Sequence, residues 1–116
     1  MTNEIYTSRF PELGFYGLPG HTRTPRDIIS QVIDAEEMGI GNVMISERAD
    51  YKEIAAICGA CAAVTKSIYI GTSGTNLNTR HPVITASMGS TLNRLSEGRF
   101  ALGLAKGSPL RWKSWG

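Results

Sequence analysis

The sequence predicts an α/β fold built on a parallel sheet, and three observations support this prediction. Short apolar segments alternate with amphipathic helical segments in the order β-α-β-α-β-α-β. The turns between them are short, and thirteen glycines against five prolines suit tight connections. Each helix then crosses between neighbouring parallel strands, as in an open doubly wound sheet or in part of a (β/α)₈ barrel. The 116 residues fit one domain, whereas a complete barrel takes about 250 residues.

The first strand–helix unit follows a polar, irregular segment at residues 1–12. Residues 13–18 are predicted to form its strand. Thr24 suits the N-cap of the following helix and Pro25 its first helical position. Apolar residues then recur at helical spacing until Gly39, which suits the C-terminal cap.

The second unit has a short buried strand at residues 43–45. Its helix is expected to start between Asp50 and Glu53, where acidic residues precede an apolar stripe. The third strand is predicted at residues 68–71.

A polar loop at residues 72–80 follows the third strand. Pro82 then opens a third helix that Gly98 ends, and residues 99–104 form a fourth strand. In both candidate architectures, binding and catalytic groups gather just after the strands, so this loop is the first place to look for a site.

Charge and hydropathy exclude several classes of protein. The net charge of +2 is too small to indicate a nucleic-acid partner. No apolar run approaches the ~18 residues of a membrane helix, and no signal-peptide pattern is present, so we expect a cytoplasmic protein without a membrane partner. Residues 108–116 are interpreted as a solvated tail that contains Trp112 and Trp115. They belong to a basic end segment with four cations: Arg99, Lys106, Arg111 and Lys113.

Cys58 and Cys61 form a CxxC inside the predicted second helix. One such pair cannot complete a four-ligand zinc site, and a redox pair would need its first cysteine at a helix N-terminus. We therefore predict buried structural cysteines. His21 and His81 show no metal-ligand spacing, so no metal site is expected, and the P-loop, GxGxxG and GxSxG motifs are absent.

Two long segments resemble the luciferase-like monooxygenase superfamily. The first is TSGTNLNTRHPVITASMGSTLNRLSEGRFALGLAKG at residues 72–107, in which an RHP turn leads a helix that ends in LSxGRF. The second is AEEMGIGNVMISER at residues 35–48. The early LPG and the ISER sequence are similar to the branch of this superfamily that uses coenzyme F420, a deazaflavin. Because several spaced elements agree over residues 13–107, the resemblance is more specific than any one motif.

The resemblance implies the N-terminal half of a (β/α)₈ barrel over residues 13–107, with the remainder of the barrel missing. It also implies an oxidoreductase that binds F420, or alternatively FMN, at the carboxyl ends of the strands and acts on a small molecule by hydride transfer or monooxygenation. Family members often hold a non-proline cis peptide at the third-strand bulge, and Ser73–Gly74 falls at this position. We therefore predict a cis bond there. Ser108 replaces a glutamate that is catalytic in sugar-phosphate-oxidising members, so that chemistry is not expected.

The same resemblance implies the site residues. Glu47 and Arg48, after the second strand, are predicted to meet the ring edge or the substrate, and His21 is a candidate acid–base group. Arg80 and His81 are interpreted mainly as a helix start. The residues predicted to bind the cofactor are Ser73, Gly74, Thr75, Asn76, Gly103 and Gly107.

Two alternatives remain open. A half-barrel exposes sheet edges and an inner face, so the chain could be a catalytically inactive fragment that self-associates, either as a homo-oligomer or with the missing C-terminal half. The second alternative is an open flavodoxin-like binding domain. Strand order separates the architectures, because a barrel keeps the sequential order 1-2-3-4 whereas a flavodoxin-like sheet has 2-1-3-4.

Overall fold

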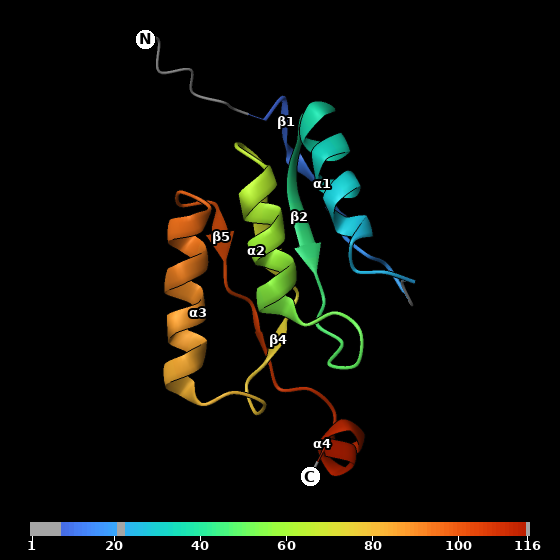
Figure 1. Cartoon of the computed structure of the whole chain (residues 1–116), viewed down its shortest axis with the longest axis vertical. Coiled ribbons are helices and arrows are strands. Elements are labelled where there is room, and N and C mark those ends of the chain that lie inside the picture. The colour runs from blue at the N-terminus through green and yellow to red at the C-terminus, as the bar shows by residue number, and fades with distance from the viewer. Residues whose placement is uncertain (1–7, 21–22, 116) are drawn as a thin grey trace.

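A computed structural model describes residues 8–20 and 23–115. Strands and helices alternate along most of this chain (Figure 1), as the sequence pattern predicts. The elements in chain order are β1 (Phe10–Tyr16), α1 (Asp27–Glu37), β2 (Ile40–Ile45), α2 (Ile54–Val64), β3 (Tyr69–Thr72), β4 (Thr75–Asn76), α3 (Pro82–Leu95), β5 (Phe100–Ala101), β6 (Leu104–Ala105) and α4 (Pro109–Trp115).

The main sheet has the order β1-β2-β3-β5, and every neighbouring pair is parallel. This sequential order is the one expected of a barrel segment, and it excludes the 2-1-3-4 order of the flavodoxin-like alternative. In a second, two-stranded sheet, β4 pairs in parallel with β6. The chain is thus an α/β half-barrel whose strands all point toward the same end.

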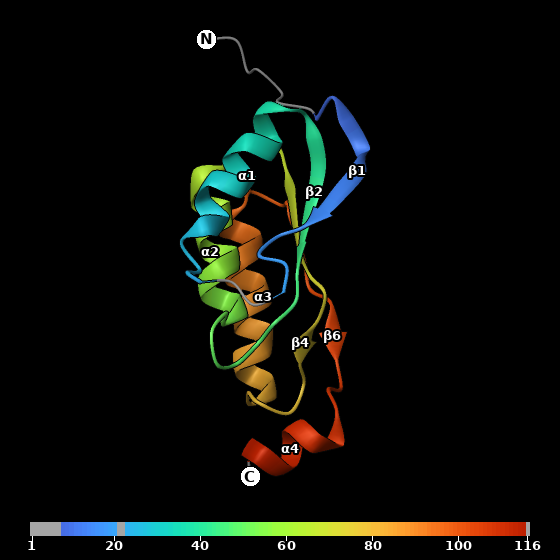
Figure 2. The ribbon, with the colours of Figure 1, turned by 90° about the vertical axis from the view of Figure 1, so that its right-hand side faces the viewer.

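Helices α1, α2 and α3 cover one face of the sheet, and Figure 2 shows the other face without a helix. The core lies between the helices and the sheet, where alternate strand residues such as Val43, Ile45 and Ile70 are buried, together with Ile68 just before β3. Some residues with the opposite orientation are exposed, as Tyr69 shows with 56% of its surface accessible. The fold therefore has two layers where a closed barrel also has a filled interior.

The observed helix boundaries can be compared with those predicted from the sequence. The first helix begins at Asp27 rather than directly after Thr24, because Thr24 opens a turn in which its carbonyl accepts from the Asp27 N–H at 3.2 Å. Glu53 caps α2 as expected, and Pro82 is the first residue of α3. Gly39 follows α1 with a φ of +84°, the left-handed conformation that favours glycine after a helix.

The strands differ more from prediction. The first strand covers Phe10–Tyr16 instead of residues 13–18, and Leu18 lies beyond it, fully buried with a φ of +51°. β1 contains Pro11 and is the edge of the sheet, where a missing N–H costs no ladder bond. The predicted fourth strand, 99–104, is divided into β5 and β6.

Thr72 accounts for this division. Its hydroxyl accepts from the Gly103 N–H and donates to the Gly103 carbonyl, both at 2.7 Å, so a side chain replaces the backbone ladder at this point. Beyond the interruption, the strand pairs with β4, which lies inside the predicted polar loop.

Arg99 is buried, with 9% exposure, and is not part of a solvated basic end. Its guanidinium donates to the backbone carbonyls of Ser96 (2.7 Å), Ile68 (2.7 Å) and Thr65 (3.0 Å). Burial lowers the pKa of Arg99, although nearby Glu36 and Glu97 act in the opposite direction. The residue connects the end of α3 to the approach to β3.

Cys58 and Cys61 are free thiols buried in α2, as predicted for a structural pair. Burial raises both thiol pKa values, that of Cys61 to about 12, so neither forms a thiolate at neutral pH. Within residues 8–20 and 23–115, no helix is long and apolar enough to cross a membrane.

Candidate functional site

A pocket of about 500 Å³ opens at the carboxyl ends of the strands. Segments distant in sequence meet there: the turn after β2, the connection from β3 to β4, the segment after β6, and α4. This is the end of a parallel α/β fold where ligands bind, since loops from neighbouring strands converge on one rim. The lining residues on which the following description depends are Ser46, Glu47, Arg48, Ser73, Gly74, Asn76, Gly107, Arg111 and Trp115.

The Ser73–Gly74 bond is cis, which confirms the prediction. The Ser73 N–H donates to the Ile45 carbonyl at 2.7 Å, and the Ser73 and Tyr16 hydroxyls lie 3.2 Å apart. Gly74 faces the segment between β5 and β6, where an added Cβ would lie 3.0 Å from the Gly103 carbonyl oxygen. This close approach favours glycine, because any larger residue would push the neighbouring backbone away, and it leaves a thin backbone wall on one side of the pocket.

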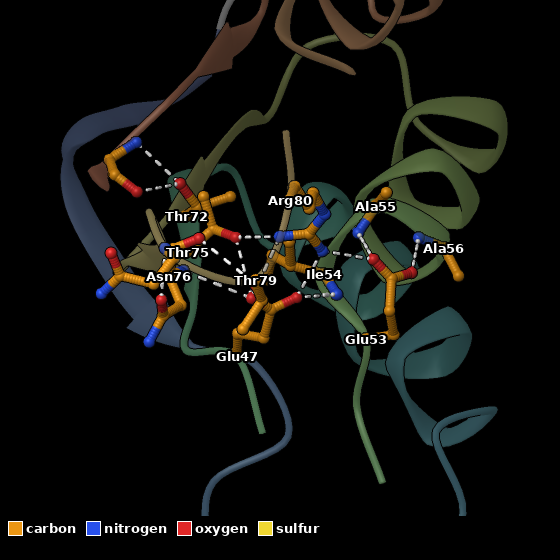
Figure 3. A network of polar contacts seen from close by, with 12 residues as sticks. Glu47, Glu53, Ile54, Ala55, Ala56, Thr72, Thr75, Asn76, Thr79 and Arg80 are labelled. Carbon is orange, nitrogen blue, oxygen red and sulfur yellow. Dashed lines mark hydrogen bonds and ion pairs between the residues drawn. The ribbon is translucent and has the colours of Figure 1, made fainter. Parts of the chain in front are cut away.

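Glu47 is the centre of a polar network at the end of β2 (Figure 3). One carboxylate oxygen accepts from the Thr75 hydroxyl at 2.8 Å, the Asn76 N–H at 3.3 Å and Arg80 Nη1 at 3.2 Å. The other accepts from the Ile54 N–H at 3.0 Å and from Arg80 Nη2 at 2.6 Å. A single side chain thus connects the end of β2, the start of α2, β4 and the loop before α3.

Arg80 also binds Glu53, with Nη2 and a Glu53 carboxylate oxygen 2.6 Å apart. Glu53 in turn accepts hydrogen bonds from the backbone amides of Ala55 and Ala56 at the start of α2, as Figure 3 shows. The guanidinium therefore lies between two carboxylates that both hold the first turn of α2 in place.

The network fixes the charge state of these groups. Burial alone would raise the pKa of Glu47, but the hydrogen bonds from Arg80, Ile54 and Thr75 outweigh it and leave the pKa below its usual value. The hydrogen bond to Glu47 raises the pKa of Arg80 against the opposing effect of burial. Glu47 is consequently ionised at neutral pH, with both oxygens committed to partners.

The structure brings most of the predicted site residues to this one pocket. The lining includes six of them: Glu47, Arg48, Ser73, Gly74, Asn76 and Gly107. Thr75 is buried behind the wall on Glu47, and Gly103 lies opposite Thr72. His21 falls outside the described residues. Their roles in binding or catalysis stay predictions.

Sequence reasoning missed several residues near the pocket. Arg111 and Trp115 line it from α4, a helix where a solvated tail was expected. Trp112 Nε1 donates to the Lys106 carbonyl at 2.9 Å, and this contact holds α4 against the segment after β6. Tyr16 was predicted to lie inside the first strand, but it is the last residue of β1. Its position depends on the register between β1 and β2, which the sequence does not indicate. Among the described residues, no cluster of three or more His, Cys, Asp or Glu side chains could hold a metal ion.

The family profile described as luciferase-like monooxygenase matches residues 11–115. This chain belongs to the luciferase-like monooxygenase family. The match confirms the resemblance drawn from the two sequence segments, and it covers both the pocket and α4.

Among curated proteins, this family member is similar to a 5,10-methylenetetrahydromethanopterin reductase of Methanolobus tindarius, with 37% identity over 82 residues. These residues are 71% of this chain and 25% of that reductase. The chain therefore spans about a quarter of the length of the curated relative.

Two solved structures show the same fold. The coenzyme F420-dependent tetrahydromethanopterin reductase of Methanopyrus kandleri matches with a TM-score of 0.74 and 30% identity, over 89% of this chain and 29% of that one. The FMN-bound oxygenating constituent of 3,6-diketocamphane monooxygenase from Pseudomonas putida also gives a TM-score of 0.74, with 26% identity over 89% of this chain and 31% of that one. The half-barrel thus corresponds to part of each longer chain.

Proposed function

We propose that this luciferase-like chain is the cofactor-binding N-terminal portion of a cytoplasmic F420-dependent oxidoreductase that transfers hydride to or from a small molecule. The observation that carries the proposal is the pocket at the strand ends, one wall of which is the Ser73–Gly74 backbone. F420 is preferred to FMN because the LPG and ISER segments are similar to the F420-using branch, and an F420-dependent reductase is among the matched structures. FMN is the alternative cofactor.

The residues of the pocket fit a flat aromatic ring. Small side chains or none form much of the lining, including Ser46, Ala49, Ser73, Gly74 and Gly107. A volume of about 500 Å³ lies within the range of pockets that hold small molecules. When bound, the deazaflavin supplies the carbon that exchanges hydride, and the protein's part is to bind and orient it.

The charged residues have separate roles in this proposal. Arg48 is exposed at the rim, where its guanidinium donates to the Glu47 carbonyl at 3.3 Å, and it would stabilise negative charge on a bound ring. Glu47 acts as a positioning residue, because a carboxylate with a lowered pKa and both oxygens bonded does not transfer protons near neutral pH. Its network holds Thr75 behind the wall and Asn76 in the pocket lining.

Titration of the chain with F420 and, separately, with FMN tests the proposal, with ligand fluorescence as the readout. We expect saturable binding that is tighter for F420. Arg48→Gln should weaken it about tenfold, equivalent to one charged contact of about 1.4 kcal/mol. Arg94→Gln is the matched control, because Arg94 lies in the last turn of α3 and does not line the pocket.

Each result leads to a different conclusion. Tighter binding of FMN would replace F420 by the alternative cofactor. If the two arginine substitutions weakened binding equally, the cofactor ring would not bind beside Arg48 at the rim. Absence of saturable binding by either ligand would contradict the proposal and favour a catalytically inactive fragment.

A further inference from the structure

Lys52 is a buried cation in the connection between β2 and α2, which lies beyond the end of β2 in Figure 1. Only 3% of its surface is exposed, although lysine is almost never fully buried without a partner of opposite charge. Within residues 8–20 and 23–115, both ion pairs are those of Arg80, so no carboxylate pairs with Lys52. Burial lowers the pKa of its amine, and the positive charge of Arg48 acts in the same direction. Charge balance therefore does not explain why this lysine is buried.

The Lys52 amine binds the backbone carbonyl of Leu18, with Nζ and the oxygen 2.8 Å apart. Leu18 is a fixed point of the fold, because its side chain is fully buried in the core and its N–H donates to Gln31 Oε1 on α1 at 2.9 Å. An amine without this acceptor would be a buried donor left unpaired, which is unfavourable. The contact therefore fixes Lys52 against the segment after β1, 34 residues away in sequence.

The backbone of Lys52 is bonded in turn to that of Arg48. The Lys52 N–H donates to the Arg48 carbonyl at 2.8 Å, and the Arg48 N–H donates to the Lys52 carbonyl at 3.2 Å. The Tyr51 N–H donates to the same Arg48 carbonyl at 3.1 Å. Residues 48–52 thus form a closed turn in which Arg48 lines the pocket. The Arg48 guanidinium is exposed and donates to the carbonyl of the neighbouring Glu47, so its place depends on the position of the turn.

We propose that Lys52 is a positioning residue that holds the Arg48 guanidinium at the rim of the pocket. It acts through the backbone of residues 48–52 and lies outside the pocket lining. The acidic side chains of the lining are paired with Arg80, so they leave Arg48 available to a ligand. The turn then directs a cation toward a flat ring that carries negative charge. The inference rests on the proposed function for the identity of the ligand, whereas the contact between Lys52 and Leu18 exists without one.

Hydrogen exchange of the full chain tests the contact without any ligand. Lys52→Met keeps a side chain of similar length and removes its donor, so the amides at positions 48 and 52 should exchange about tenfold faster. Amides in the ladder between β2 and β3 should not change. Lys66→Met is the matched control, because Lys66 is exposed beyond the C-terminal end of α2, and it should leave exchange in the turn as in the parent. Unchanged exchange of the turn in Lys52→Met would overturn the inference.

Titration with F420 tests the effect on the pocket. Lys52→Met should weaken binding by about five- to tenfold, and no more than Arg48→Gln does, because it acts through Arg48. In the Arg48→Gln background, the same substitution should change the dissociation constant by less than about twofold. A general loss of structure would instead weaken binding equally in both backgrounds, and this result would overturn the inference. Binding by Lys52→Met that is as tight as binding by the parent would overturn it as well.

Two further variants complete the test. Lys52→Arg retains a cation with donors long enough to reach the Leu18 carbonyl, and it should bind within about twofold of the parent. A loss as large as that of Lys52→Met would assign the effect to packing at position 52 and overturn the inference. Lys52→Gln, whose amide is one bond shorter, replaces Lys52→Met if circular dichroism shows that the methionine variant does not fold. If the parent binds neither F420 nor FMN, the proposed function fails, and hydrogen exchange still decides whether Lys52 holds Arg48 in place.

Discussion

Glu47 and Glu53 offer a direct test of how burial changes the strength of an ion pair. Both carboxylates lie 2.6 Å from the same nitrogen of Arg80, but the Glu47 side chain is 10% exposed and that of Glu53 is 51% exposed. Removing one partner of a buried pair costs about 3–5 kcal/mol. Because Glu53 still faces the guanidinium, we expect Glu47→Gln to cost less, about 2–3 kcal/mol.

Glu53→Gln is the matched substitution, with the same change in charge and shape. Exposed ion pairs contribute about 0–1 kcal/mol, and glutamine keeps one side-chain oxygen for the amides at the start of α2. We therefore expect a loss below about 1 kcal/mol. Urea unfolding followed by circular dichroism measures the free energy of unfolding of both variants. If this free energy falls by about 2 kcal/mol per molar urea, the urea midpoint of Glu47→Gln should be about 1–1.5 M below that of the parent. An equal or larger loss for Glu53→Gln would refute the reasoning.

Three other predictions concern groups away from the pocket. Arg99→Lys should lower the free energy of unfolding by about 2–4 kcal/mol in the same assay, because an ammonium cannot donate to all the buried carbonyls and each one left unbonded costs about 1–3 kcal/mol. A loss below about 1 kcal/mol would contradict this. Cys58 and Cys61 should resist a thiol reagent at pH 8 until denaturant is added, because burial raises their pKa values; prompt labelling of the native chain would contradict this. Burial alone would raise the pKa of Glu36, but hydrogen bonds from the backbone and side chain of residues 66–68 outweigh it and lower the pKa. Its carboxylate therefore stabilises the fold above about pH 4.3 and loses this effect as the pH falls through the lowered pKa, so Glu36→Gln should be less stable at pH 7 and approach the parent by pH 3; a constant difference in urea midpoint would show otherwise.

The order of elements and the core were predictable because they depend on local patterns. Apolar periodicity places Val43, Ile45 and Ile70 in the core. The N-cap of α2 at Glu53 and the first residue of α3 at Pro82 lie where acidic and proline residues favour a helix start. Boundaries that depend on partners distant in sequence were not predictable. The division of the last strand requires the contact between Thr72 and Gly103, 31 residues apart, and no local pattern indicates it.

The candidate site was predictable in position more than in detail. Strand ends and the family resemblance located Glu47, Ser73 and Gly74 at one rim, and the cis bond was predicted from that resemblance. The pairing of Glu47 with Arg80 was not predicted. It depends on how β4 directs the loop before α3, and β4 forms only by pairing with β6.

The position of α4 determines which part of this molecule intrinsic tryptophan fluorescence reports on. Both tryptophans of the chain, Trp112 and Trp115, belong to this one short helix beside the pocket. Their indole emission therefore samples the rim alone, whereas the layers between the helices and the sheet contain no indole. Quenching or a wavelength shift of this emission on addition of a coloured ligand would report binding at the rim. Unfolding of the layers between the helices and the sheet would not change the emission until α4 itself unfolded.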